Sequence, residues 1–220
     1  MVLRRLLVLP LLGLLWLGAA HATSDTPPSA RELVMVTTER LILALQDQLD
    51  AIKQDMDTAY RLADDTVIPY IDFPRITRWV TGKHWRSATP EQQQRLTRAF
   101  QELLTRSYVT AMVTYADQIL ANADNVQYPA ARSQQEGNNA VVTMLIKLEN
   151  NKDAVVQYQM YLTDTGWKIY DVKVEGVSLA ITYRSSFSQE IAKGGIEGLI
   201  AQLEARNHTA DSGPSPASAP

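Results

Sequence analysis

Hydrophobic positions along the chain change their spacing twice. Up to about residue 117 they recur every three or four positions, which is typical of amphipathic helices. Between about residues 125 and 175 they alternate with polar positions, which is typical of half-buried strands, and the helical spacing then returns. This order predicts an α+β domain, in which helices pack over one face of a curved four-stranded antiparallel sheet.

The helices expected in the first half of the chain begin at recognisable capping residues. Ser29 is followed by Glu32 in capping-box spacing, and Thr89 precedes a proline at the first helical position. Gly82 is expected to end the third helix. The pattern predicts helices over residues 29–53, 57–70, 74–81 and 89–117.

The second half predicts a meander of strands and then two helices. Asn150–Asp153 and Asp164–Gly166 are turn-forming stretches between strands. Gly194 and Gly195 interrupt the last helical pattern. The expected strands cover residues 125–132, 138–148, 154–162 and 167–175, and the expected helices cover residues 178–192 and 196–206.

Both ends of the chain predict segments outside the folded domain. Arg4 and Arg5 precede an apolar run and small residues around Ala22, which predicts a secretory signal peptide over residues 1–22 with cleavage near Ala22. The apolar run is short for a membrane anchor. Residues 207–220 are rich in Ala, Ser and Pro, which predicts a disordered tail. A single domain is therefore expected over residues 23–206.

The cysteine count and the net charge argue against several classes of function. The chain has no Cys, so it can hold no lipid anchor on cysteine and no disulfide. Removal of Arg4 and Arg5 with the signal peptide leaves 19 basic residues against 24 acidic ones, a formal charge of −5. No basic run is present. These features argue against nucleic-acid binding and against tight adsorption to an anionic membrane.

The residue types that most enzymes and metal sites use are scarce. Of three His, only His84 falls in the predicted domain, so a His/Cys metal site is excluded and a surface role is expected for His84. The acidic pairs Asp55/Asp57 and Asp64/Asp65 are expected to be helix caps or solvated faces. No cofactor, no metal and no enzymatic activity are predicted.

Apolar and methionine side chains on the predicted inward faces are the remaining candidates for a site. Either a filled core or a cavity would require them, and periodicity does not distinguish the two. Met adapts to variable apolar ligands, and a curved sheet covered by helices can leave an interior space. Both interpretations stay open on the residues alone.

The segment from Trp167 to Ser178 resembles the W-x-x-Y-D-x-x-x-E-G-V-S signature of the MlaC (toluene-tolerance) family, the periplasmic phospholipid-binding proteins. The resemblance covers nearly the whole chain after the signal peptide, and the tail departs from it. Further pieces occur in the family's order: Pro69, Asp72, Gly82, Trp85, Ala88–Pro90, Gln92, Phe100, Leu103, Tyr108, Tyr183–Arg184, Phe187 and Gly194–Leu203.

The resemblance implies an NTF2-like sheet with an apolar cavity, in a periplasmic carrier of glycerophospholipid that maintains outer-membrane lipid asymmetry. The implied partners are an inner-membrane ABC transporter complex with a MlaD-type ring and an outer-membrane lipoprotein–porin complex. Pattern and motif together predict the lipid-binding residues, with Val177 at the mouth: Val67, Ile71, Phe100, Leu104, Met112, Val142, Met144, Ile146, Tyr158, Met160, Val172, Val174 and Val177.

Two other classes of protein fit the same sequence. A periplasmic binding module for a different apolar ligand shares every feature above. A non-catalytic scaffold protein with a filled core would have the same pattern but no extractable lipid. A lipid hydrolase is the weakest alternative, because the residues for it are missing.

Overall fold

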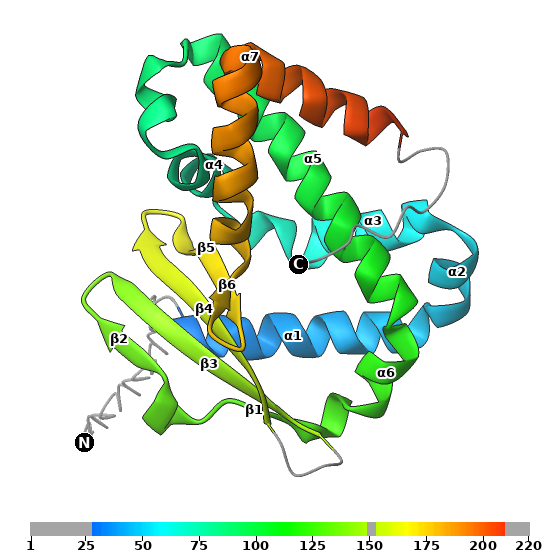
Figure 1. Ribbon diagram of the computed structural model, residues 1–220. Coiled ribbons are helices and arrows are strands. Elements are labelled where there is room, and N and C mark those ends of the chain that lie inside the picture. Colours follow the sequence, from blue (N-terminus) through cyan, green and yellow to red (C-terminus); the bar gives the residue numbers. More distant parts are fainter. Residues whose placement is uncertain (1–27, 149–152, 210–220) are drawn as a thin grey trace, which may run out of the picture.

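The computed structural model describes residues 28–148 and 153–209, and it is an α+β fold in which helices pack around an antiparallel sheet (Figure 1). The expected signal peptide and most of the expected Asn150–Asp153 loop lie outside the described residues. The helices are α1 (Ala30–Asp47), α2 (Leu49–Gln54), α3 (Met56–Thr66), α4 (Phe73–Thr81), α5 (Pro90–Thr114), α6 (Ala116–Ala121) and α7 (Leu179–Thr209), with 3-10 turns η1 (Ile68–Tyr70), η2 (Gly82–Ser87), η3 (Ala123–Asn125) and η4 (Ala130–Arg132).

Three long antiparallel strands form the sheet, and they agree with the alternating pattern to within about one residue. They are β3 (Asn139–Lys147), β4 (Asp153–Thr163) and β5 (Gly166–Val174). The fourth expected strand, over residues 125–132, is reduced to β1 (Val126–Gln127), because Pro129 donates no hydrogen bond and a 3-10 turn follows it. Two further short strands, β2 (Gln134–Glu136) and β6 (Val177–Ser178), bring the described strands to six rather than four.

A β-bulge in β5 changes which side chains share a face. Gln159 lies opposite Asp171 and Met160 lies opposite Ile169, so Tyr170 is an extra residue in the ladder. Strict alternation would place Ile169 on the face opposite to Val172. The bulge instead brings Trp167 and Ile169 onto the same face as Val172 and Val174, which corrects the simple period-2 expectation.

Helix caps determine where the two main helices begin. The Glu32 backbone N–H donates to Ser29 Oγ at 3.2 Å, and the Ser29 N–H donates to Glu32 Oε2 at 3.1 Å. Thr89 and Gln92 form the same reciprocal pair at the start of α5. Both capping boxes are therefore confirmed.

Two of the expected long helices are interrupted. The first breaks at Gln48, between α1 and α2, and the longest breaks at Tyr115, between α5 and α6. Even so, α5 has 25 residues and crosses the helical side of the molecule (Figure 1).

Three apolar clusters form the core. The largest joins α4, α5 and α7 around Phe100, whose ring packs edge-on against Tyr183 and Phe187. A second joins α1, α2, α3, α6 and the end of α5. The third places Ala30 and Val34, at the start of α1, against Met160 and its neighbours on the sheet. α1 therefore covers part of one sheet face, while α4 and α7 reach the sheet at β5.

The last helix bends at Gly195, where φ is 67°, and returns along α5. Arg95 on α5 pairs with Glu197 at 2.5 Å and with Glu204 at 3.0 Å. Asn207 is buried and its amide donates to the Ala99 carbonyl at 3.0 Å. α7 therefore continues past the boundary at 207 that the composition suggested for the tail.

Candidate functional site

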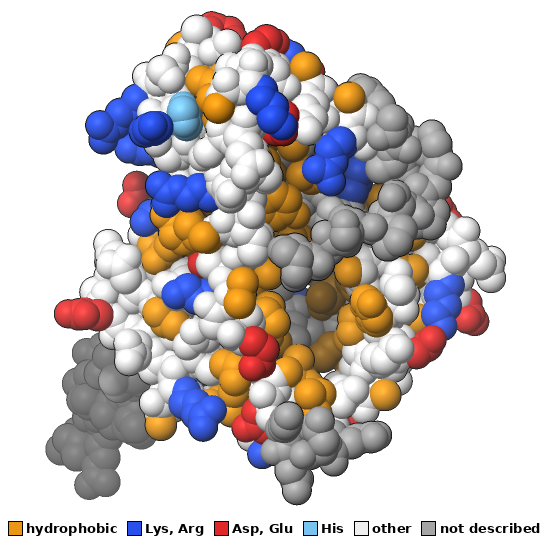
Figure 2. All heavy atoms as spheres, in the orientation of Figure 1, with side chains coloured by type: hydrophobic (Ala, Val, Ile, Leu, Met, Phe, Trp, Pro, Cys, Tyr) orange, Lys and Arg blue, Asp and Glu red, His pale blue; other side chains and the backbone are white. Residues whose placement is uncertain are grey.

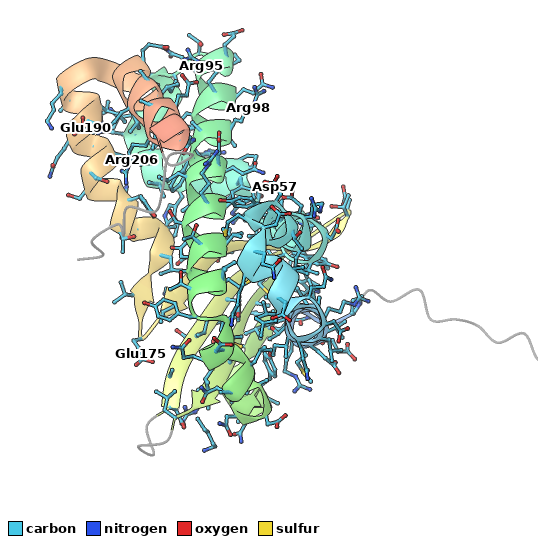
Figure 3. The ribbon with its side chains drawn as sticks, turned by 90° about the vertical axis from the view of Figure 1, so that its right-hand side faces the viewer. Asp57, Arg95, Arg98, Glu175, Glu190 and Arg206 are labelled. Atoms are coloured by element: carbon cyan, nitrogen blue, oxygen red, sulfur yellow. The ribbon has the colours of Figure 1, made fainter. Side chains whose placement is uncertain are left out.

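A hollow opens between the sheet and the long helix α5. The extensive contacts of α5 within the described residues are with the helices α3, α4, α6 and α7. α1 covers only part of the sheet face that points toward α5. Figure 2 shows the resulting hollow, with hydrophobic side chains inside it and around it, and Figure 3 shows α5 between α7 and the α1–α3 helices with the strands beyond it.

The sheet side of the hollow is apolar. Val172 lies opposite Tyr158, and Val174 lies opposite Val156, which pairs in turn with Met144. These side chains share one face of the sheet by register. Val156, Tyr158 and Val172 keep part of their surface accessible although they lie on central strands. A face with apolar side chains and accessible surface is what a ligand wall requires.

Tyr158 lies deep in the fold although part of its surface is accessible. Burial raises the pKa of its hydroxyl well above the ordinary value of 10.0. The hydroxyl lies 3.8 Å from Met144 Sδ. Tyr158 therefore packs beside the third cluster, on the sheet face that α1 partly covers.

The helix side is a stripe along α5. Leu104, Tyr108, Met112 and Tyr115 recur at spacings of three to four residues and lie on one side of the helix. Tyr108 is 43% exposed, yet burial raises its pKa to about 12, and the electrostatic influence of Tyr183 and Asp171 adds to the shift. The influence of Asp171 and Tyr183 indicates that the Tyr108 hydroxyl lies near the junction of β5 and α7.

That junction is held by a buried carboxylate. Asp171 is 2% exposed, and its Oδ1 accepts from Ser178 Oγ at 2.8 Å and from the Ala180 N–H at 3.4 Å. Ser178 Oγ in turn accepts from the Ile181 N–H, so it acts as the N-cap of α7. The Asp and Ser of the signature segment thus fix the start of the helix that borders the hollow.

Large apolar side chains stand exposed at this rim. Val174, Val177 and Ile181 are 38%, 57% and 37% exposed. Between Val174 and Val177 the chain turns through Glu175, with φ 51°, and Gly176. Figure 3 shows Glu175 at this turn, at the edge of the molecule, where its carboxylate accepts from the Val155 N–H at 2.6 Å. Val177 therefore lies at the surface, at the turn between β5 and α7.

The structure separates the thirteen predicted site residues into two groups. Phe100, Val142 and Met160 have essentially no accessible surface and belong to closed clusters, so they form the core behind the walls. Ile71 packs against the α4–α5–α7 cluster and bridges to Ile169. Leu104 and Met144 are also buried, at 9% and 8% exposure, and Leu104 belongs to the same cluster as Phe100. The following keep accessible surface: Val67, Met112, Ile146, Tyr158, Val172, Val174 and Val177.

Tyr108, Val156 and Ile181 were not among the predicted residues but belong with this group. Tyr108 was available from its position four residues after Leu104 on the same helical stripe. Val156 alternates with Tyr158 on β4. Ile181 carried no signal, because its exposure depends on how α7 leaves the sheet.

The described residues contain no group of three or more His, Asp or Glu that could hold a metal ion. Asp55 caps α3, accepting from the Asp57 N–H at 3.0 Å, and its pKa is lowered by that hydrogen bond. In the part of the chain that the structure describes, no helix has the length and hydrophobicity to cross a membrane. An apolar hollow bordered by a sheet and a helix defines a binding protein for an apolar ligand.

Comparison with known proteins names the family. The chain belongs to the MlaC family, whose model, described as MlaC protein, matches residues 36–205. It is 27% identical over 215 residues to toluene tolerance protein ttg2D of Pseudomonas putida, covering 92% of this chain and 94% of that protein. It is 22% identical over 186 residues to the intermembrane phospholipid transport system binding protein MlaC of Haemophilus influenzae, covering 83% of each.

A solved structure has the same fold. The phospholipid-binding protein from Ralstonia solanacearum, determined in complex with a phospholipid, superposes with a TM-score of 0.70 at 29% sequence identity. The match covers 84% of this chain and 99% of that chain. The resemblance found in the sequence motifs is therefore confirmed at the level of the family.

Proposed function

We propose that this protein is a periplasmic phospholipid carrier. The observation that carries the proposal is the apolar hollow between the sheet face of Tyr158 and Val172 and the α5 stripe of Tyr108. Relatives named for phospholipid transport and a structural neighbour solved with a phospholipid support it. In this function the acyl tails occupy the hollow and the head group lies at the rim near Val177.

Burial of the tails requires such a hollow. At about 0.8 kcal/mol per buried CH₂, a 16-carbon tail gains on the order of 12 kcal/mol by leaving water. Release is therefore favourable only onto a partner that buries the tails equally well. We infer that the donor and acceptor are an outer-membrane lipoprotein–porin complex and an inner-membrane ABC transporter complex with a MlaD-type ring.

A carrier needs no catalytic group, and the charged residues near the hollow support that interpretation. Asp171 holds the start of α7, and Glu175 accepts from the Val155 N–H at 2.6 Å. Both carboxylates have structural hydrogen bonds that account for their positions. We therefore propose that the protein binds lipid without chemical change and is not a hydrolase.

Native mass spectrometry of the mature protein, purified without detergent, tests the proposal. A mass excess equal to that of a diacyl phospholipid, released intact on denaturation, is the expected result. Recovery of fatty acid and lysolipid would instead indicate a hydrolase. A sterol or isoprenoid in the extract would indicate a binding module for another apolar ligand. Protein that stays free of lipid after incubation with phospholipid vesicles and a lipid-loaded donor would contradict the carrier function.

A further inference from the structure

One segment of this acidic protein contains no acidic residue. Between Asp72 and Glu91 the chain has Arg75, Arg78, Lys83 and Arg86 and not a single Asp or Glu. In the sequence these cations are spread over α4 and η2 and form no run. Their consequence depends on how the fold arranges them.

The fold gathers the cations on one surface. α4 buries Phe73, Ile76 and Val80 against the core, which leaves Arg78 exposed on the opposite side. Figure 2 shows Lys and Arg side chains gathered over α4 and the residues that follow it.

A further cation comes from α7. The Arg184 guanidinium lies over Gly82, where an added Cβ would be 3.1 Å from Arg184 Nη2. Gly82 therefore lets α7 bring its arginine onto the same surface. We call Arg78, Trp79, Lys83, Arg86 and Arg184 the basic ridge.

The charges of the basic ridge are uncompensated. Arg78, Lys83, Arg86 and Arg184 are all exposed, and none of them forms an ion pair with any residue in the described ranges. Elsewhere exposed cations do pair, as Lys53 does with Asp117 at 2.8 Å. Four unpaired cations on one surface attract a dense negative charge.

Trp79 adds an aromatic group to the ridge. It is 37% exposed on the solvent side of α4, next to Arg78. Its ring is amphipathic, and Trp beside Arg or Lys is typical of residues that reside at the level of lipid head groups. The ridge thus combines the two residue types that recognise an anionic phospholipid surface.

We propose that the basic ridge adsorbs weakly to anionic phospholipid head groups at a membrane surface. α4 and η2 lie at the outer edge of the helical side of the molecule (Figure 1), so among the described elements they are open to a flat surface. Charges more than about 8 Å from the surface are screened at physiological salt, so the net negative charge of the protein opposes contact only slightly. A discrete acidic protein surface is the competing partner.

The expected affinity for an anionic bilayer is low enough for a carrier that must dissociate from the membrane. Each cation near an anionic bilayer raises partitioning roughly fivefold, so four give a few hundredfold at low salt and much less at high salt. This is not the tight adsorption that the acidic net charge argues against. Adsorption through the ridge would bring the hollow close to membrane lipid. This role in transport rests on the proposed carrier function.

Vesicle co-sedimentation of the mature protein tests the ridge. The probes are vesicles of phosphatidylethanolamine with about 30% phosphatidylglycerol, and vesicles of phosphatidylcholine alone. We expect binding to the anionic vesicles at about 0.02 M NaCl that falls at least about tenfold at 0.3 M. Arg78→Glu, Lys83→Glu and Arg86→Glu together should abolish it.

A matched triple variant controls for net charge. Arg40→Glu, Arg61→Glu and Arg98→Glu make the same charge change on exposed cations of α1, α3 and α5, and should leave most of the vesicle binding in place. Equal loss in both triple variants would overturn the proposal, because net charge alone would then explain it. Absence of binding by the unaltered protein at low salt would also overturn it and would favour an acidic protein as partner.

The two proposals fail in different measurements. The ridge variants should retain bound phospholipid in native mass spectra, because the ridge residues lie outside the hollow. Vesicle binding without any bound lipid would contradict the carrier function and leave the ridge intact. Bound lipid without vesicle binding would contradict the ridge alone.

Discussion

Val172 and Val80 illustrate the difference between a side chain that lines the hollow and a side chain in the filled core. Val172 lies on β5 opposite Tyr158 and keeps accessible surface. Val80 on α4 is 0% exposed in the α4–α5–α7 cluster. Both are apolar positions in a regular pattern, so the sequence treats them alike. They differ in whether the space beyond the side chain is filled.

The same substitution should therefore lower the free energy of unfolding at Val80 and leave it nearly unchanged at Val172. Val80→Phe adds volume to a packed cluster and should lower the free energy of unfolding by about 1–3 kcal/mol. Val172→Phe extends into the hollow and should leave stability nearly unchanged while it reduces lipid occupancy. Urea unfolding and native mass spectrometry measure the two quantities. A strong loss of stability in Val172→Phe with unchanged lipid content would mean that the space next to Val172 is filled.

At the scale of elements, the turn between α4 and η2 depends on one glycine. Gly82 ends α4 with φ 59° and ψ −126°, a backbone conformation that L side chains rarely adopt. The atoms nearest to a side chain at position 82 would be the flexible end of Arg184 on α7, which can move aside. Backbone strain rather than collision should therefore decide the effect of a substitution.

Gly82→Ala should lower the free energy of unfolding by about 1–3 kcal/mol. Gly198→Ala is the matched control, because Gly198 lies within helix α7 with open space around a built Cβ, and alanine there should stabilise by about 0.5–1 kcal/mol. Urea denaturation of both variants gives the comparison. Rescue of Gly82→Ala by Arg184→Ala would show that collision with the guanidinium, not backbone strain, dominates.

Element patterns in the sequence predicted the long strands and the capped helix starts, because these depend on local periodicity and capping chemistry. They did not predict the breaks at Gln48 and Tyr115, where neither Gly nor Pro marks the end of a helix. The bulge at Tyr170 was also missed, since an inserted residue only shows when the ladder is paired. These features depend on packing between elements.

The same contrast between local sequence pattern and packing applies to the residues of the candidate site. Alternation on β4 and β5 predicted the shared face of Tyr158 and Val172, and the helical spacing predicted Leu104 and Met112 on one side of α5. The pattern could not separate walls from core, so Phe100 was grouped with them. A side chain against a hollow and a side chain in a core are both apolar, and only the three-dimensional position of α5 relative to the sheet distinguishes them.

For the whole molecule, the hollow makes stability depend on the ligand. An empty apolar space leaves its lining without packing partners on one side. A ligand that binds only the folded state adds free energy of unfolding according to its concentration relative to Kd, about 3–4 kcal/mol at 100 to 1,000 times Kd. Bound lipid should therefore add to the free energy of unfolding, and its removal should lower it.

Delipidated protein should melt at a lower temperature than protein purified with its lipid. For a chain of this size 1 kcal/mol corresponds to about 2–4 °C, so saturating phospholipid should raise Tm by roughly 6–16 °C. Scanning calorimetry with a soluble short-chain phospholipid measures the rise, which should continue with the logarithm of ligand concentration above Kd. Val172→Phe is the control that should show a much smaller rise. An unchanged Tm in the unaltered protein would mean that phospholipid does not bind the folded state in preference to the unfolded state, and it would contradict binding in the hollow.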